Sequence, residues 1–396
     1  TIVLAAGSFV AALNQTDGLF DPNSIPIGRY IMRSVLLIAC LFLSWVGISG
    51  LFRLTKSKII VGVLLSLTSL FSLLLILEIA LSVTAISSGG GQVLVSRNWF
   101  NFYWQENQFG YRDGEPAELD RPDKKNILIV GDSYVAGHGL KKEGERFSNL
   151  LRNKLSSCYD VFNLGVCGAN TIDQIAFLED YPIKPDLVVL VHGKNDIQEV
   201  RSSAEIQRIL DIDPESVSDY PKQKWKSSYL MKNSFLVNLL EFLVHKVAEK
   251  DYMSKISSRH SKLEDILATD AGKLWYYSYY LNQELMETHL NMLDSIADWT
   301  ERNNSEYLLM LFPATTDQIL SDTDRIINQP IQQHAEKNQV SVLNLTAVLE
   351  EMSESDRVVS KLDPHPSIKL NKAVADTLSK RILRIMKTGN SCKPSL

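Results

Sequence analysis

Four short clusters of small and polar residues carry the groups that acyl transfer needs. They are Gly131-Asp-Ser133-Tyr134, Asn163-Leu-Gly165-Val-Cys-Gly168, His192-Gly-Lys194-Asn195-Asp196 and Asp363-Pro-His365-Pro366. In acyl transfer a serine attacks a carbonyl, a histidine takes its proton, and an aspartate fixes the imidazole tautomer. Backbone N–H groups and a carboxamide stabilise the oxyanion that forms. The clusters therefore predict a serine-dependent acyl-transfer site.

The first three clusters each follow a short apolar run of the kind that forms a buried parallel strand. Strands are expected at 126–130, 160–164, 186–191, 307–312 and 340–345. Helices are expected at 144–157, 171–180, 281–303, 324–338 and 368–386. This alternation predicts an α/β domain with a doubly wound parallel sheet. In such sheets ligands bind beyond the carboxyl ends of the strands, where these clusters fall.

In this order the clusters resemble the SGNH/GDSL hydrolase superfamily, over residues 100–388 roughly. The likeness is strongest to bacterial membrane-anchored members. They share an upstream Asn-x-x-Gly-x-Arg element, here residues 107–112, and a GDSY-x-x-G-x-G extension, here residues 131–139. Some of these relatives accompany envelope or exopolysaccharide gene sets, and some are O-acetyltransferases. The resemblance implies a flavodoxin-like five-stranded sheet and a reaction without a cofactor.

The resemblance also implies a role for each matching residue. Ser133 would be the nucleophile, His365 the general base and Asp363 the acid that orients the imidazole. The oxyanion hole would be formed by the backbone amides of Ser133 and Gly168 and by the side chain of Asn195.

Two of these assignments have alternatives. Many superfamily members have two residues between the acid and the base, whereas only Pro364 separates Asp363 from His365 here. The backbone, or another acid such as Asp356, is the alternative group to orient the ring. Gly165 is the alternative to Gly168 as an oxyanion donor.

Three further cluster residues are candidates for substrate contact, with packing as the alternative for each: Tyr134, His192 and Lys194. No spacing of His, Cys or Asp resembles a metal site, so no metal is expected.

Charge and hydropathy divide the chain into two parts. Residues 1–100 carry a net charge of +3 within a total of −5, so the remainder is acidic. The runs 34–52 and 59–86 are long enough to span a bilayer, which takes roughly 20 apolar residues. The loop 53–58 between them carries three positive charges, so the positive-inside rule places it in the cytoplasm and everything after residue 87 outside.

Some features of the anchor leave alternatives open. Arg29 and Arg33, before the first run, argue against this orientation. Glu78 is the single charge in the second run, about 20 residues or roughly 30 Å along it, so it is expected at the outer interface. A functional intramembrane acid is the alternative. Residues 2–13 are either the tail of a further span or a processed end.

These observations predict five parts: an extracytoplasmic segment (1–33), a two-helix anchor (34–86), a linker with an aromatic lead-in (87–125), a hydrolase-like domain (126–388) and a tail (389–396). An aromatic helical insertion at about 200–280 is interpreted either as a lid over the site or as a cap with a small core of its own. Cys158 and Cys392 are expected near one edge of the sheet, and we expect them to pair if the domain faces an oxidising compartment.

An apolar share of 45% and a negative net charge exclude a disordered chain and a basic nucleic-acid binder. The sequence predicts a membrane-anchored serine esterase that hydrolyses an acyl ester on an extracytoplasmic glycan or lipid. The acyl group expected first is acetyl. One alternative is an O-acyltransferase that uses the same residues and receives acyl groups from a membrane-protein partner. The other is a non-catalytic subunit of a membrane complex.

Overall fold

The computed structural model describes residues 26–54, 57–89, 94–121, 123–198, 209–210, 229–257, 276–316 and 320–386. The chain forms two compact units. One consists of Thr1–Trp104 and Pro221–Lys255, and the other of Gln105–Tyr220 and Ile256–Leu396.

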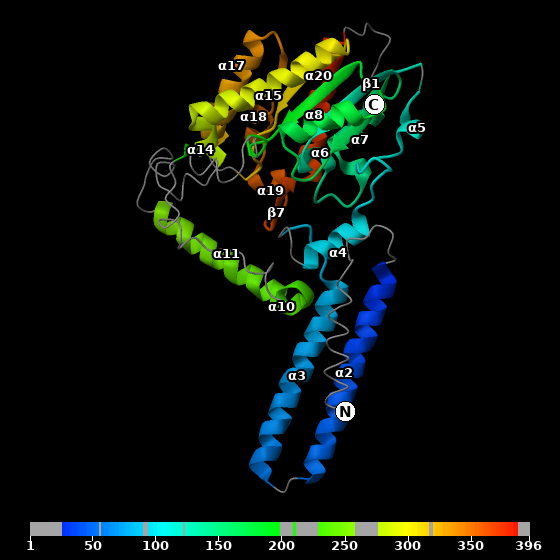
Figure 1. Cartoon of the computed structure of the whole chain (residues 1–396), viewed down its shortest axis with the longest axis vertical. Helices are drawn as coiled ribbons and strands as arrows, with labels where there is room; N and C mark the ends of the chain where they lie inside the picture. The colour runs from blue at the N-terminus through cyan, green and yellow to red at the C-terminus, as the bar shows by residue number, and fades with distance from the viewer. Residues whose placement is uncertain are drawn as a thin grey trace. The chain divides into compact units, whose positions relative to one another are not determined.

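The first unit is helical (Figure 1). Its described helices are α2 (Pro26–Leu54), α3 (Lys58–Thr84), α4 (Leu94–Tyr103), α10 (Tyr229–Asn233) and α11 (Phe235–Ser257). The segments Ile31–Arg53 and Lys58–Ser82 are long and apolar enough to cross a membrane, and most of their length is not buried in the protein. Both features suit a membrane anchor, because lipid is the environment that large exposed apolar surfaces of this length require.

The second unit has a five-stranded parallel sheet in the order β2-β1-β3-β4-β5. The strands are β1 (Lys125–Gly131), β2 (Tyr159–Gly165), β3 (Leu187–His192), β4 (Glu306–Leu311) and β5 (Ser341–Asn344). Their apolar runs are buried on both faces, as parallel sheets require. This order confirms the predicted flavodoxin-like, doubly wound fold.

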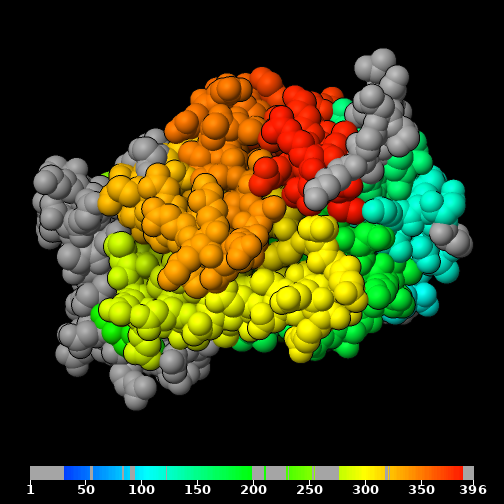
Figure 2. All heavy atoms as spheres, turned by 90° about the horizontal axis from the view of Figure 1, so that it is seen from above, coloured from blue at the N-terminus to red at the C-terminus, as the bar shows by residue number. Residues whose placement is uncertain are grey.

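Helices cover both faces of the sheet. One face packs against α8 (Thr171–Asp180), α15 (Gln283–Arg302) and α17 (Gln329–Lys337). The other packs against α7 (Phe147–Leu155), α18 (Thr346–Glu350) and α20 (Ile368–Ile385). Figure 2 shows how the segment from yellow α15 to red α20 forms one continuous surface of this unit. Shorter helices are α5 (Pro116–Leu119), α6 (Ser133–Ala136), α14 (Tyr276–Leu281), α16 (Leu320–Thr323) and α19 (Glu354–Arg357), with a π-helical turn at Asp324–Asn328.

A small antiparallel hairpin was not predicted. It pairs β6 (Val358–Ser360) with β7 (Asp363–Pro366). β7 carries the whole Asp-Pro-His-Pro cluster, so hairpin pairing rather than a free loop holds it.

The insertion expected at about 200–280 differs from its prediction. Phe235 and Phe242 of α11 pack against Leu94 and Val95 of α4, in the helical unit. The interpretation of the insertion as a cap with its own small core is therefore wrong for residues 229–257. Most of the other insertion residues lie outside the described part of the chain.

The pairing of the cysteines is relevant to the predicted location of the α/β unit, because disulfides persist in oxidising compartments. Cys40 and Cys167 are free, and Cys158 is disulfide-bonded. Cys392, the partner that the sequence suggested, lies outside the described residues.

Candidate active site

Ser133 is placed where a buried strand meets a short helix. β1 ends at Gly131, and α6 begins at Ser133. Asp132 lies between them and caps the helix, because its Oδ1 accepts the N–H of Tyr134 at 2.8 Å. A Cβ at Gly131 would lie 2.6 Å from Val135 Cγ2, so the tight strand-to-helix turn requires glycine there.

A chain of hydrogen bonds joins the three residues of the predicted triad. His365 Nε2 lies 2.9 Å from Ser133 Oγ, and His365 Nδ1 lies 2.6 Å from Asp363 Oδ1. Because a carboxylate only accepts, Nδ1 carries the proton, which leaves the Nε2 lone pair facing the serine hydroxyl. The Asp363 side chain is 1% exposed. Asp356, the alternative acid, instead pairs at the surface with Lys369 at 2.7 Å.

The predicted oxyanion donors lie around the same cleft as the serine. Its volume is about 290 Å³. The lining residues are Asp132, Ser133, Tyr134, Gly168, Asn170, Lys194, Asn195, Gln198, Tyr276 and His365. Gly168 has φ +81°, a conformation that glycine adopts freely. The structure thus brings together Ser133, Gly168 and Asn195, and it adds Tyr134 and Lys194 of the candidate substrate contacts.

Gly165, the alternative oxyanion donor, is not among the residues that line this cleft. A Cβ at Gly165 would lie 2.2 Å from the backbone nitrogen of Ala136, so this glycine allows β2 and α6 to approach closely. Asn163 supports the same contact, because its side-chain amide donates to the carbonyl of Val135 at 2.7 Å. These residues position the nucleophile helix.

His192 is not in the cleft, and its predicted substrate contact is corrected. Its side chain is buried with Nε2 2.9 Å from Nε2 of His289 and 3.3 Å from the Tyr280 hydroxyl. It follows Val188 and Leu190 on the face of β3 that packs beneath α15, since alternate residues of a strand share a face. Burial lowers the pKa of His192 to about 3, so the ring stays neutral.

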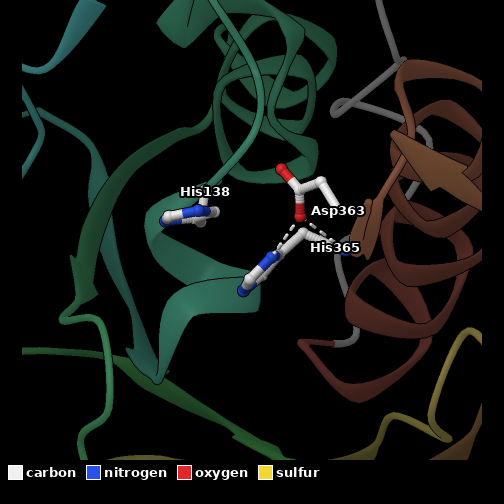
Figure 3. Close-up of side chains that lie close together, drawn as sticks. All are labelled: His138, Asp363 and His365. Carbon is white, nitrogen blue, oxygen red and sulfur yellow. Dashed lines mark hydrogen bonds and ion pairs between the residues drawn. The ribbon is translucent and has the colours of Figure 1, made fainter. Parts of the chain in front are cut away.

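His138 follows Ser133 by five residues and lies beside the triad. Its ring centroid is 4.2 Å from that of His365, with an interplanar angle of 37°. Figure 3 shows it next to Asp363 and His365, while the hydrogen bonds drawn join the aspartate only to His365. Ligand atoms of these three residues lie within 4.8 Å of one another, a spacing that could hold a metal ion. Asp363 and His365 already form a chain of hydrogen bonds to Ser133, so the arrangement favours acyl transfer over metal binding.

The upstream Asn-x-x-Gly-x-Arg element supports the loop that follows α6. Asn107 Oδ1 accepts the N–H groups of Phe109 and Tyr111, which closes a turn. Arg112 then donates to the carbonyls of Gly137 and Leu140, both at 2.8 Å. The Arg112 side chain is fully buried, so its guanidinium fixes the segment that carries His138.

Asp113 anchors a buried charge network behind this loop. It accepts hydrogen bonds from Arg152 Nη2 at 2.6 Å and 2.9 Å, from Arg146 Nη2 at 3.4 Å, and from the N–H of Asn163 at 2.9 Å. The Arg146 and Asp113 side chains are both 0% exposed. Burial lowers the pKa of Arg146 to about 10, and the charge of Asp113 opposes that shift, so the carboxylate offsets part of the cost of burying this guanidinium.

We expect Asp113→Ala to destabilise the α/β unit by about 3–5 kcal/mol, because it leaves a buried guanidinium without its counter-charge. The midpoint of thermal unfolding of the full chain in detergent, followed by near-UV circular dichroism, should fall by roughly 6–20 °C. The matched control is Asp376→Ala, whose pair with Lys154 has side chains 54% and 36% exposed. That change should cost at most about 1 kcal/mol. Equal losses in the two variants would contradict the network's role.

A comparison with protein-family models agrees with this site. Residues 129–255 match the model of the GDSL-like Lipase/Acylhydrolase family. A comparison with curated proteins gives no match.

Three solved structures illustrate the structural comparison. A lipolytic protein of the G-D-S-L family from Desulfitobacterium hafniense DCB-2 shares 13% identity, over 65% of this chain and 99% of that chain, with a TM-score of 0.36. An acetylxylan esterase from Geobacillus stearothermophilus shares 15%, over 68% and 98%, with a TM-score of 0.36. An alpha/beta hydrolase enzyme from the metagenome of Lake Arreo, Spain, shares 14%, over 66% and 95%, also at 0.36.

The family match covers Ser133, Gly168 and Asn195, and the fold adds His365 from a segment more than 100 residues beyond the matched range. The sheet order is the one that the family resemblance implied. Residues 129–255 therefore resemble the GDSL-like lipase/acylhydrolase family, and the hydrogen-bond chain at the site supports a serine ester hydrolase.

Proposed function

We propose that this protein is a membrane-anchored serine esterase that cleaves a short acyl ester, acetyl in the first place, from a glycan or lipid outside the cytoplasm. The observation that carries the proposal is the Ser133–His365–Asp363 hydrogen-bond chain at the edge of a cleft lined by Gly168 and Asn195. The two long apolar helices support the anchor. The basic loop 53–58 supports an orientation with that loop in the cytoplasm.

The reaction follows from the geometry of the triad. Ser133 Oγ attacks the ester carbonyl carbon while its proton passes to His365 Nε2, 2.9 Å away. Asp363, 2.6 Å from Nδ1, stabilises the imidazolium that results. The tetrahedral intermediate collapses when the imidazolium gives its proton to the leaving alcohol oxygen and the C–O bond breaks. Water then attacks the acyl-enzyme by the same route and releases the carboxylic acid.

We assign the stabilisation of the oxyanion to groups that line the cleft. The amides of Ser133 and Gly168 and the Asn195 side chain are the donors that we assign. Asp132 lies behind this loop and is buried, and burial raises the pKa of its carboxyl group. Asp132 contacts both the Tyr134 N–H and the Asn195 side chain. These contacts fix the turn that carries Ser133 relative to the Asn195 amide.

We expect Asn195→Ala to lower kcat by about 10²–10³-fold with little change in KM, because its amide acts mainly on charge that develops in the transition state. The measurement is steady-state hydrolysis of p-nitrophenyl acetate by the full chain in detergent. Asn291→Ala, on the exposed side of α15, is the matched control and should leave kcat unchanged. A rise in KM at constant kcat would instead assign Asn195 to substrate binding.

The cleft suits a short acyl group on a polar alcohol. Its volume is about 290 Å³, and carboxamide, hydroxyl and ammonium groups are prominent in its lining. Tyr276 adds an aromatic ring at the cleft, and its hydroxyl donates to Gln198 Oε1 at 3.0 Å. Carbohydrate hydroxyls and rings match such a mixture of polar and aromatic groups.

The proposal is tested by trapping the acyl group. The purified full chain is incubated with an acetylated glycan or lipid extract, and the reaction is quenched in acid. The protein is then digested, and the mass of the peptide that contains Ser133 is measured by mass spectrometry. An acetyl adduct on Ser133, together with faster hydrolysis of p-nitrophenyl acetate than octanoate, is expected. A longer acyl adduct would contradict the acyl preference. Transfer of acetyl to added glycan oligomers in place of water would contradict hydrolysis as the physiological reaction.

A further inference from the structure

Helix α11 is apolar on two opposite faces. One face is buried, with Phe235 and Phe242 in a core with residues of α4. On the opposite face, four apolar side chains are exposed: Leu240 (53%), Leu243 (46%), Val244 (64%) and Val247 (70%). The spacing i, i+3, i+4, i+7 places these four side chains, named here the α11 stripe, along one side of the helix. A helix that is apolar on both sides needs two apolar environments.

The first turn of α11 is fixed to the membrane helices by one carboxylate. Glu78 of α3 accepts the backbone N–H groups of Phe235 at 2.8 Å and Leu236 at 3.0 Å, and the Ser234 hydroxyl at 2.8 Å. It thereby satisfies N–H groups that a helix start leaves without partners. Arg33 of α2 pairs with the same carboxylate, and its guanidinium lies 5.0 Å from the Phe235 ring centroid. Three helices therefore meet at a buried ion pair.

The level of this ion pair in the bilayer follows from helix geometry. Glu78 lies 20 residues after Lys58, and Arg33 lies 20 residues before Arg53. At about 1.5 Å per residue, both are roughly 30 Å from the loop that joins α2 and α3, which is the thickness of a hydrocarbon core. The pair is thus at the membrane boundary opposite that loop, where the sequence placed Glu78, and α11 starts at this level.

The direction of the α11 stripe follows from what the other face contacts. Leu81 of α3 and Ala85, the residue that follows α3, also pack against the core that contains Phe235 and Phe242; both come after Glu78 and so lie farther from the bilayer. The opposite side of α11 therefore faces back toward the part of α3 that precedes Glu78. There Leu73 is 53% exposed. Figure 1 shows α11 leaving this end of α3 at a steep angle.

We propose that α11 is an interfacial helix whose stripe rests in the outer leaflet of the membrane that α2 and α3 span. The stripe faces the same side as the exposed apolar side chains of α3, a helix long and apolar enough to cross a membrane, so lipid is the occupant that these surfaces favour. Lys246 and Glu249, paired at 2.9 Å, lie away from the stripe, as the polar side of an interfacial helix does. The inference rests on the membrane anchoring in the proposed function and extends the anchor from two spans to a third contact.

The test measures where single residues lie in the full chain, reconstituted in phosphatidylcholine–phosphatidylglycerol nanodiscs. In a background with Cys40→Ala and Cys167→Ala, one cysteine is introduced by Val244→Cys, Lys246→Cys or Leu73→Cys and labelled with the fluorophore NBD. Quenching by doxyl-labelled lipid is compared with quenching by aqueous iodide. For position 244 we expect lipid quenching at least threefold stronger than for position 246, with iodide quenching in the reverse order.

The three positions separate the possible failures. Iodide quenching at 244 equal to that at 246, with lipid quenching at 73, would overturn the interfacial helix and leave the anchor intact. Protection of 244 from both quenchers would also overturn it, and would assign the stripe to a protein partner or to a second copy. Absence of lipid quenching at 73 would overturn the anchoring as well. Hydrolysis of p-nitrophenyl acetate in the same discs reports on the esterase proposal separately.

Discussion

Ser133→Ala should lower kcat for p-nitrophenyl acetate by about 10⁴-fold or more, to the residual rate that the oxyanion donors and binding alone sustain. The reason is geometric: the Ser133 hydroxyl is the oxygen within 2.9 Å of His365 Nε2, so its removal leaves the base with no nucleophile to activate. KM should change little. The measurement is steady-state kinetics with the full chain in detergent, and labelling by a fluorophosphonate probe should disappear in parallel.

The matched control for this variant is Ser295→Ala. Ser295 is exposed on α15, where its hydroxyl donates to the carbonyl of Asn291 at 2.9 Å, and its loss should leave kcat unchanged. Wild-type activity in Ser133→Ala would contradict the assignment of Ser133 as the nucleophile. Failure of the folded wild-type protein to react with the fluorophosphonate would instead favour a non-catalytic SGNH-fold component.

Asp363→Asn should lower kcat by about 10³–10⁴-fold while the fold is retained. The carboxylate accepts the Nδ1 proton at 2.6 Å and also the backbone N–H of His365 at 3.1 Å. An amide nitrogen in that place donates to Nδ1, which moves the ring proton to Nε2 and removes the lone pair that Ser133 needs. Steady-state kinetics checks the rate, and the fluorophosphonate should label Ser133 more slowly by a similar factor.

Asp356→Asn is the control, because Asp356 is the other acid that the sequence offered to orient the ring. It pairs with Lys369 at the surface, so its activity should stay within twofold of wild type, as expected for an exposed pair. Loss of activity in Asp356→Asn with retention in Asp363→Asn would reverse the assignment. Both variants should keep the wild-type unfolding midpoint within a few degrees.

The strands and the residues at their ends were open to prediction because they depend on local patterns, whereas the order of the strands was implied only by the family resemblance. Continuous apolar runs such as 126–130 predict buried strands, and the residue after a strand end is fixed by the chain itself. Ser133 and Asn195 could therefore be assigned to one edge of the sheet before any coordinates were considered. The family resemblance then linked them with His365.

His192 shows an error that strand periodicity could have prevented. It shares the face of β3 with Val188 and Leu190, so its side chain points into the core beside His289, whereas Lys194, two residues beyond, lies past the strand and lines the cleft. Proximity in sequence to a motif does not decide which face a side chain takes. His138, by contrast, could not have been assigned from spacing, because the turn after α6 brings its ring to His365.

By itself, the sequence determined the parallel sheet, the positions of three of the four clusters at strand ends and two segments long enough to span a membrane. These follow from hydropathy patterns a few residues long. Only the tertiary structure decided that Asp363, rather than Asp356, faces the His365 ring, that a β6–β7 hairpin holds this pair, and that Arg33, Glu78 and the start of α11 meet at one point. Each of these joins residues whose partners are chosen by packing and by the need to satisfy buried charges, which no local pattern encodes.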